Sequence, residues 1–475
     1  MLGAIGLYQW FLPQVFYLGH GSFRSYKRAG IPENLINPLK DIEGKRFQQK
    51  ELLQAMESRV GTKAFHQYEE ILWKYVRKNR NCWPNTHSQS VYEIQGSEGH
   101  PLFGILTYEP LIPFSEMPPL PTQFVFLPED QGLLVMGKYG HIVHFNSNYE
   151  EKFRLKIPDV YEGLEDQGAL GLALDLDFQE NQFLYIAYVN LAGNQNVVQR
   201  LQWKGDKQTI IKSLVDVLRV PKHKNKFHGV GAIHFNSKGV LLIPIGDPVS
   251  FGQDRSSEQG KLLGILPKHG AEGGYTVPDW GVWHQLKAWV TMGRPIVLAS
   301  GLRSPWTATL WKDTLFIGDV GGDGPYSYEE INYFYTPEMN FGWGACVDPQ
   351  LHGDFVPPVI AYRRNDTASF KDVPNGSKAR HRSVWVGVVY DNFSIDRYQG
   401  KLKQFLIYGD FYLGFVRGAK LNQQGQVIDD VFLMHLPYLT NLRIGRDGYI
   451  YALAATGEQG LYRLRLMDKK AHSEN

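Results

Sequence analysis

Six copies of one short pattern recur between residues 119 and 466. Each copy combines a polar turn that contains Gly or Asp, a short run of β-branched and aromatic residues, and a second Gly or Asp. The copies are GLLVMGKYGHIVHF (132–145), FLYIAYVN (183–190), GVLLIPIGD (239–247), DTLFIGDV (313–320), FLIYGDF (405–411) and GYIYALAATGEQGLYRL (448–464). Their irregular spacing predicts a β-propeller of six blades with insertions of variable length. The pattern alone leaves a β-sandwich with long loops as the alternative.

The composition favours an all-β fold. The 475 residues include 49 Gly, 26 Tyr and 26 Phe, which suit many short strands joined by tight turns. The formal net charge is only +2, and no run of Lys and Arg interleaved with aromatic residues occurs. We therefore expect no nucleic-acid partner.

The N-terminal segment has an anchor-like pattern. Residues 1–22 carry no charged side chain, and Arg24, Lys27 and Arg28 follow directly. The segment lacks the basic start of a secretory signal and the Arg-rich composition of a mitochondrial presequence. Pro13 interrupts it, whereas a spanning helix needs about 20 apolar residues. We expect residues 1–22 to contact a membrane or a partner subunit, with an atypical signal as the remaining alternative.

A mainly helical extension is expected at residues 23–118. Apolar side chains at three- and four-residue spacings predict two amphipathic helices that are broken near Gly61. These side chains are Leu52, Leu53, Met56, Val60, Tyr68, Ile71, Leu72, Tyr75 and Val76. A β-prone patch at 91–94 and a proline-rich connector at 109–121 lead to the propeller, which we expect to span residues 119–466. A polar tail follows at residues 467–475.

Only two cysteines occur, Cys82 and Cys346. The chain therefore has no disulfide framework and no cysteine-based zinc site. A single bridge between the extension and the propeller is one option in an oxidising compartment, and two unrelated buried thiols are the other.

A series of motifs follows the strands of the propeller region. They are DQGALGLALDLDF (166–178), HGVGAIHFNSKGVLLIPIGD (228–247), SGLRSPWTATLW (300–311), GDVGGDGPYSYEEINYF (318–334), NFGWG (340–344), PPVIAY (357–362), VGVVYDN (386–392) and GDFYLGFVRG (409–418). In this order they resemble the motifs of the soluble glucose/sorbosone dehydrogenases, which are quinoprotein sugar dehydrogenases, and the chain looks like a divergent, non-bacterial member. The resemblance implies a six-bladed propeller and is less specific for activity.

The resemblance also implies a site over the central channel that binds pyrroloquinoline quinone and Ca²⁺. His228 falls on the histidine that takes the proton of the sugar C1 hydroxyl while hydride passes to the quinone. Arg303 falls on the arginine that stabilises the reduced cofactor. Asp166 or Gln167 corresponds to an early cofactor-contacting Gln, the register leaving both options.

Several positions depart from the pattern of the family. Ser304 replaces an Asn, which keeps a hydrogen-bonding group but shortens the reach of the side chain. Val320 replaces a Gln that contacts the cofactor, and a valine cannot make that hydrogen bond. The basic residues that pair with the cofactor carboxylates align with Asp391, Tyr412 and Leu413. Without these cations, several charge-assisted hydrogen bonds worth about 1.5 to 3 kcal/mol each would be lost.

Other side chains are candidates to complete such a site. Arg417 is a candidate for cofactor binding, and Lys138, Lys222 and Lys224 are further candidates to replace the missing cations. Metal ligands would come from the residues after the fourth repeat, because Ca²⁺ prefers oxygen ligands. These candidates are the backbone carbonyls of Gly321 and Gly322 and the carboxylate of Glu329.

The departures favour a degenerate dehydrogenase-like propeller that serves as an accessory or structural subunit of a membrane-associated complex. Its favoured setting is the mitochondrial inner membrane, as part of a respiratory complex, with residues 1–118 bound to other subunits and no cofactor. The alternative is an active aldose dehydrogenase that depends on pyrroloquinoline quinone and Ca²⁺, with His228 as base. A secreted or surface-anchored ligand-binding propeller is a third possibility, which glycosylation at Asn365 or Asn392 would support.

Overall fold

The computed structural model describes most of the chain. The described residues are 15–18, 26–27, 29–42, 47–74, 76–79, 92–94, 96–223, 227–248, 251–254, 256–278, 294–322, 328–344, 355–363, 370, 373, 381–391 and 394–467. Cys82, Cys346, Lys224 and the three sequons at Asn365, Asn375 and Asn392 lie outside them, as do residues 1–14 and 468–475.

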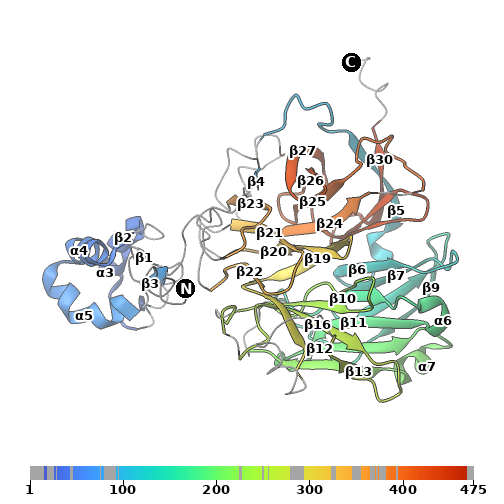
Figure 1. The fold of residues 1–475 in the computed structure, drawn as a ribbon, viewed down its shortest axis with the longest axis horizontal. Coiled ribbons are helices and arrows are strands. Elements are labelled where there is room, and N and C mark those ends of the chain that lie inside the picture. The colour runs from blue at the N-terminus through green and yellow to red at the C-terminus, as the bar shows by residue number, and fades with distance from the viewer. Residues whose placement is uncertain are drawn as a thin grey trace, which may run out of the picture.

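The six-bladed propeller is confirmed. Six consecutive antiparallel sheets of at least four strands each make up the large body in Figure 1. Blades I and II contain β6 (Pro121–Phe126), β7 (Leu133–Gly137), β8 (His141–Phe145), β9 (Glu151–Lys156), β10 (Ala169–Leu174), β11 (Phe183–Val189), β12 (Gln195–Gln202) and β13 (Val215–Pro221). Blade II also carries the short helices α6 (Phe178–Asn181) and α7 (Lys207–Lys212).

The remaining blades follow in chain order. Blade III contains β14 (His234–Phe235), β15 (Leu241–Ile245), β16 (Lys261–Pro267), β17 (Tyr275–Thr276), β18 (Ile296–Ser300) and β22 (Met339–Asn340). Blade IV contains β19 (Pro305–Trp311), β20 (Thr314–Asp319), β21 (Tyr328–Phe334) and β23 (Ile360–Arg363). Blades V and VI contain β24 (Val384–Tyr390), β25 (Phe405–Asp410), β26 (Phe415–Leu421), β27 (Val427–His435), β28 (Leu439–Ile444), β29 (Ile450–Ala454) and β30 (Gln459–Leu466).

The ring is closed by a strand from the N-terminal side. β5 (Leu106–Pro113) pairs antiparallel with β30 and supplies the outer strand of blade VI, and the 3₁₀ helix η2 (Phe114–Glu116) leads on to blade I. The propeller therefore starts upstream of residue 119, the start expected from the sequence. The connector is a strand in spite of its prolines because it lies at the outer edge of the blade, where proline is tolerated.

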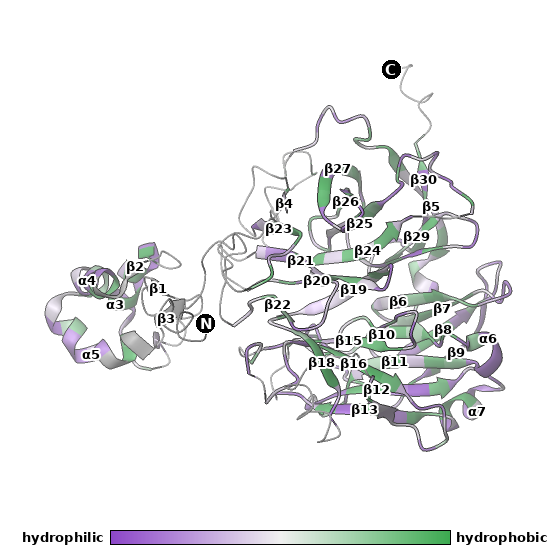
Figure 2. Ribbon diagram, in the orientation of Figure 1, coloured by the Kyte–Doolittle hydropathy of each residue, from purple (hydrophilic) through white to green (hydrophobic). Residues whose placement is uncertain are grey.

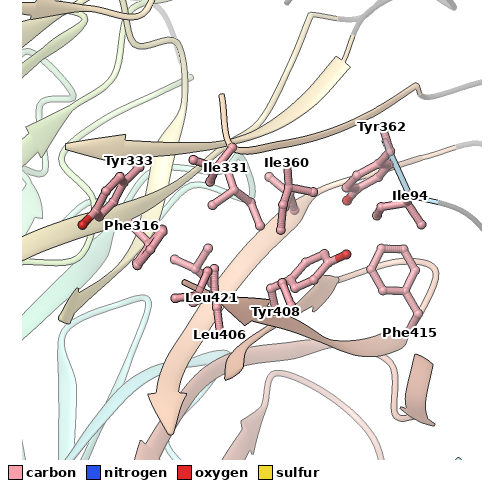
Figure 3. Packing of buried hydrophobic residues seen from close by; sticks show 14 of the residues in the cluster. Ile94, Phe316, Ile331, Tyr333, Ile360, Tyr362, Leu406, Tyr408, Phe415 and Leu421 are labelled. Atoms are coloured by element: carbon pink, nitrogen blue, oxygen red, sulfur yellow. The ribbon is translucent and has the colours of Figure 1, made fainter. Parts of the chain in front are cut away.

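Hydrophobic clusters between successive blades hold the propeller together. One such cluster lies between each pair of neighbours, and the one between blades VI and I joins the two ends of the ring. In Figure 3, Phe316 and Tyr333 of blade IV face Leu406 and Leu421 of blade V. Figure 2 shows the matching pattern, with hydrophobic residues concentrated along the strands.

The segment before β5 fastens the outer edges of blades IV and V. β4 (Tyr92–Glu93) pairs parallel with β23, and Ile94 is buried in the cluster between the two blades. The Ser97 hydroxyl accepts a hydrogen bond of 2.8 Å from the backbone N–H of Phe432 in blade V. Residues 92–113 thus run along three consecutive blades.

The N-terminal extension has a small core of its own. It contains β1 (Val15–Leu18), α3 (Glu33–Ile36), η1 (Asn37–Ile42), β2 (Phe47–Gln48), α4 (Gln49–Val60), α5 (Thr62–Lys74) and β3 (Val76–Asn79) (Figure 1). The two predicted helices are α4 and α5, and Gly61 separates them with a φ of 85°. Leu52, Met56 and Leu72 are buried in this core. Among the described residues, no helix is long and apolar enough to cross a bilayer.

Glycines allow the innermost strands of neighbouring blades to approach closely. A Cβ atom on Gly231, just before β14, would lie 1.9 Å from the carbonyl oxygen of Pro305 in β19. A backbone carbonyl on an inner strand cannot move without disturbing its blade, so only glycine fits at this position.

Replacing Gly231 by Ala should therefore destabilise the propeller by about 3 kcal/mol or more, as overpacking does at its upper range. Urea unfolding of the full chain measures this. Gly96→Ala is the matched control, because no atom lies within 4 Å of its added methyl group. Equal unfolding midpoints for the two variants would contradict the proposed packing.

Candidate functional site

A cavity of about 640 Å³ lies where the innermost strands of the blades begin. Its described lining comes from all six blades, at the starts of the inner strands and at the turns after the second strands. The lining residues are Leu120, Pro121, Thr122, Lys138, Leu164, Glu165, Asp166, Leu170, Phe227, His228, Gly229, Arg303, Ser304, Trp306, Val320, His381, Arg382, Ser383, Phe411, Tyr412, Thr440 and Ala455. Such a volume suits a ligand of cofactor size.

Buried aspartates fix the strand starts around the cavity. Asp319, at the end of β20, accepts hydrogen bonds from the backbone N–H groups of Arg303 and Ser304. Asp410, at the end of β25, accepts one from the backbone N–H of Ser383 at 2.9 Å. Burial raises the pKa of Asp319 to about 7, against the opposing effect of these N–H groups. The Gly-Asp ends of the repeats are thus structural clamps.

His228 and Asp166 form a hydrogen-bonded pair at the cavity wall. The Asp166 carboxylate contacts His228 Nδ1 at 2.8 Å, and its other oxygen accepts from the backbone N–H of His228 at 3.1 Å. An ionised carboxylate can only accept, so Nδ1 carries the proton and Nε2 presents a lone pair. His228 has a φ of 56°, a conformation that costs energy for a residue with a side chain.

Arg303 lines the cavity from blade IV, the blade next to that of His228, and its side chain has fixed contacts. Its guanidinium donates to the carbonyl of Val320 at 2.8 Å and lies 5.3 Å from the centre of the Trp343 ring. Arg303 and Ser304 are both buried, and both line the cavity together with Val320. Val320 occupies the position expected from the sequence, and its backbone holds Arg303 in place.

Further cations reach the cavity from blades I and V. Lys138 follows β7 and is buried, and its ammonium donates to the carbonyl of Gly163 at 2.8 Å. Burial lowers the pKa of Lys138. Arg382, just before β24, is also buried and lines the cavity. Lys138, Arg303 and Arg382 therefore place three cationic groups around one cavity.

The sequence comparison at blade V was wrong about where its cation lies. Asp391 comes after β24, about 25 Å of strand away from Ser383 at the cavity, and it accepts a hydrogen bond from the Trp311 indole instead. The cation of this blade is Arg382, before the strand. The sequence does contain a signal for Arg382, because Arg382 precedes β24 just as Arg303 precedes β19.

Arg417 does not line the cavity. It is fully buried in β26, where its guanidinium pairs with Asp430 at 2.6 Å. The hydroxyl of Tyr408 donates to the other oxygen of the same carboxylate at 2.6 Å. The inner positions of a central blade strand face the neighbouring blades, so Arg417 has a structural environment and the candidate role in cofactor binding fails on its position.

The sequence left open whether Asp166 or Gln167 corresponds to the early cofactor-contacting Gln. The structure brings Asp166, and not Gln167, to the cavity wall. Asp166 lines the cavity and partners His228, whereas Gln167 is 1% exposed behind it and is not among the lining residues. Glu165, Trp306, His381 and Phe411 also line the cavity, and sequence reasoning missed them. Glu165 and His381 stand between strands, where no repeat pattern marks them, whereas Trp306 lies in β19 and Phe411 closes the fifth repeat copy.

The metal candidates do not come together in a carboxylate site. Glu329 is fully buried in β21, where its carboxylate accepts from the backbone N–H of Val384 at 3.0 Å. Gly321 and Gly322 follow β20 next to residues that the structure does not describe. The described residues contain no group of three or more His, Cys, Asp or Glu side chains that could hold a metal ion.

Comparisons with known proteins agree with this architecture. Residues 119–354 match the family described as Glucose / Sorbosone dehydrogenase. Residues 119–354 of this chain belong to that family. An uncharacterized protein of Synechocystis sp. is 24% identical over 329 residues, which is 62% of this chain and 70% of that protein.

Two solved structures of similar fold bear the names of sugar dehydrogenases. The aldose sugar dehydrogenase of Streptomyces coelicolor, in a form bound to pyrroloquinoline quinone, has a TM-score of 0.57 and 16% identity, covering 77% of this chain and 99% of that chain. The soluble aldose sugar dehydrogenase of Escherichia coli, in its apo form, has a TM-score of 0.59 and 21% identity, covering 76% and 100%. At these identities the likeness shows the fold.

A buried lysine beside the His228–Asp166 pair gives the stability a pH dependence. Burial lowers the pKa of Lys222 to about 8, and the charge of Asp166 opposes this shift. An unfolded lysine titrates near pH 10.4, so between about pH 8 and 10.4 the native state binds fewer protons and its stability rises with pH.

Thermal unfolding of Lys222→Met should lack this rise, so the parent chain gains stability relative to the variant as the pH passes from 8 to 10. Lys152→Met, at an exposed position of β9, serves as the control. Parallel stability curves for the parent chain and Lys222→Met would contradict the assignment.

Proposed function

We propose that this chain is an oxidoreductase that removes hydride from the hydroxyl-bearing carbon of a sugar-like alcohol, with a quinone of the pyrroloquinoline quinone type as cofactor. The observation that carries the proposal is the His228–Asp166 pair, which faces a cavity that also receives three cationic side chains. The family and the names of its structural relatives support the same chemistry. We favour this alternative over a degenerate propeller because Lys138 and Arg382 line the cavity. They are our candidates to replace the basic residues of the family that are missing from this sequence.

The residues of the cavity fit such a cofactor. Pyrroloquinoline quinone is a flat tricarboxylate, and it needs cations around its edge and apolar surface against its faces. Lys138 and Arg382 approach from different blades and are suited to its carboxylates, while Arg303 is suited to its quinone oxygens. Trp306 and Phe411 supply aromatic surface, with ring centres 6.2 Å apart. When bound, the quinone would supply the acceptor for the hydride.

His228 is assigned as the general base. Its Nδ1 proton is held by Asp166, so in this tautomer Nε2 is the ring nitrogen that accepts the proton of the substrate hydroxyl. Asp166 fixes the tautomer and stabilises the imidazolium that forms, as the carboxylate of a catalytic triad does. Arg303 cannot deprotonate, and its guanidinium places a fixed positive charge where negative charge develops. The described residues offer no carboxylate cluster for Ca²⁺, so no step is derived through that ion.

Replacing His228 by Ala should abolish dye-linked sugar oxidation, a loss of at least about 100-fold, because general-base catalysis contributes that much or more. Asp166→Asn should lower the turnover as well, since an amide can also donate and then favours the opposite tautomer. Turnover that is unchanged in both variants would exclude the scheme.

Cofactor binding tests the cation shell without any substrate. Lys138→Met and Arg382→Met should each weaken binding of pyrroloquinoline quinone about 10- to 100-fold in calorimetric titration, as expected for one charge-assisted hydrogen bond. Lys152→Met, at an exposed position far along blade I, should bind like the parent chain. Absence of binding by the folded parent chain would contradict the proposal.

A second function rests on the N-terminal extension. We infer that residues 1–118 serve to attach the propeller to other subunits of a membrane-associated complex, with the mitochondrial inner membrane as the favoured place. The extension has its own buried core, and none of its described residues is among the lining residues of the cavity. This attachment role is compatible both with a catalytically active cavity and with a cavity that has lost its catalytic activity.

Removal of residues 1–91 tests this second function, because it leaves β4 and β5 on the propeller. The shortened chain should migrate alone on native gels of detergent-solubilised membranes, whereas the full chain should migrate in a larger complex. Identical migration of the two chains would contradict attachment through the extension.

A further inference from the structure

The mouth of the cavity is rimmed by exposed apolar side chains. Leu164 is 90% exposed, Phe227 50%, Tyr412 45% and Leu120 37%. All four line the cavity, and they come from blades II, III, V and I. We call these four residues the apolar rim. Large apolar side chains that stay exposed together around one opening mark a binding surface more often than chance exposure.

Most of the cationic and basic groups of the same cavity lie deeper. The His228 side chain is 11% exposed, and Lys138, Arg303 and Arg382 are buried, whereas the side chain of Asp166 is 42% exposed. The inner end of the site is therefore polar, and its mouth presents the apolar rim beside Asp166 and the exposed His381. A small, fully hydroxylated sugar would use the inner end and leave the apolar rim in water.

We propose that the substrate is an amphipathic polyol, namely a sugar or sugar-like alcohol that carries an apolar substituent at the end remote from the hydroxyl oxidised. This inference rests on the proposed function, which places the reacting hydroxyl at His228. With that hydroxyl at the inner end, the opposite end of the sugar points to the mouth. An acyl or alkyl group there covers Leu164 and Phe227, and burial of this apolar surface adds to the affinity.

Leu164 is the most informative member of the apolar rim. It lies in the loop before β10, two residues from Asp166, and neighbouring residues of the loop are held in place. Lys138 binds the carbonyl of Gly163, and the Tyr161 hydroxyl donates to Glu165 at 2.9 Å. The exposed leucine is therefore presented by a loop with fixed contacts on both sides.

The test is calorimetric titration of the full chain with glucose and with 6-O-octanoyl-glucose, an ester whose apolar chain is attached at the end opposite C1. The ester should bind at least tenfold more tightly than glucose, which corresponds to about 1.4 kcal/mol. Leu164→Ser and Phe227→Ser should each reduce this preference, taken as the ratio of the two affinities, at least threefold. Leu176→Ser is the matched control, because Leu176 is 54% exposed and does not line the cavity.

Equal affinities for the two sugars, or a preference that survives both rim substitutions, would overturn the inference. So would binding of the full chain to phosphatidylcholine vesicles that the rim substitutions abolish without any preference for the ester, because the rim would then contact a lipid surface. The titration needs neither cofactor nor turnover. A chain that prefers the ester but oxidises no sugar would support this inference and contradict the proposed function.

Discussion

Buried carboxylates that bind backbone N–H groups hold the candidate site in shape. Asp319 and Asp410 each reach from the end of a second strand to the start of the innermost strand of the same blade. Both carboxylates lie out of water, where an unpaired one would be costly, so their partners are effectively obligatory. Arg303 and Arg382 stand at these clamped strand starts, and the clamps therefore determine where the cationic groups of the cavity lie.

In blade I, the repeat position of these aspartates holds a lysine. Where blades III, IV and V carry Asp247, Asp319 and Asp410 after the second strand, blade I carries Lys138. The backbone of Lys138 donates to the carbonyl of Leu120 in its own blade and accepts from the N–H of Ala169 in blade II. The side chain of Lys138 lines the cavity and donates to the carbonyl of Gly163. Blade I thus carries a cation that lines the cavity at a repeat position where other blades carry a structural carboxylate, and the ring of blades remains closed.

The sequence predicted the repeat architecture, because it depends on local patterns. Strand runs bounded by Gly and Asp marked the blades, and His228 and Arg303 stood in motifs that the structure brings to one cavity. Long-range relations could not be predicted in the same way. β5 joins blade VI by pairing with a strand about 350 residues further along the chain, and no local signal specifies that partner.

The direction of a strand explains the remaining errors. Asp391 and Arg382 flank the same strand, and only the end that points to the cavity decides which one belongs to the site. Arg417 was a candidate for cofactor binding because it is a basic residue in one of the family motifs. Its burial against Asp430 depends on tertiary packing that the sequence does not show. The spacing of residues in the sequence predicts which face of a strand a side chain occupies. It predicts less readily at which end of the propeller that residue lies.

The proposed cofactor site can be tested with a crystal structure of the full chain soaked with pyrroloquinoline quinone. We expect a single flat molecule in the cavity, with its carboxylates against Lys138 and Arg382 and its quinone oxygens beside Arg303, and with His228 Nε2 facing the space left for substrate. An empty cavity at saturating cofactor, or cofactor bound elsewhere on the propeller, would contradict it.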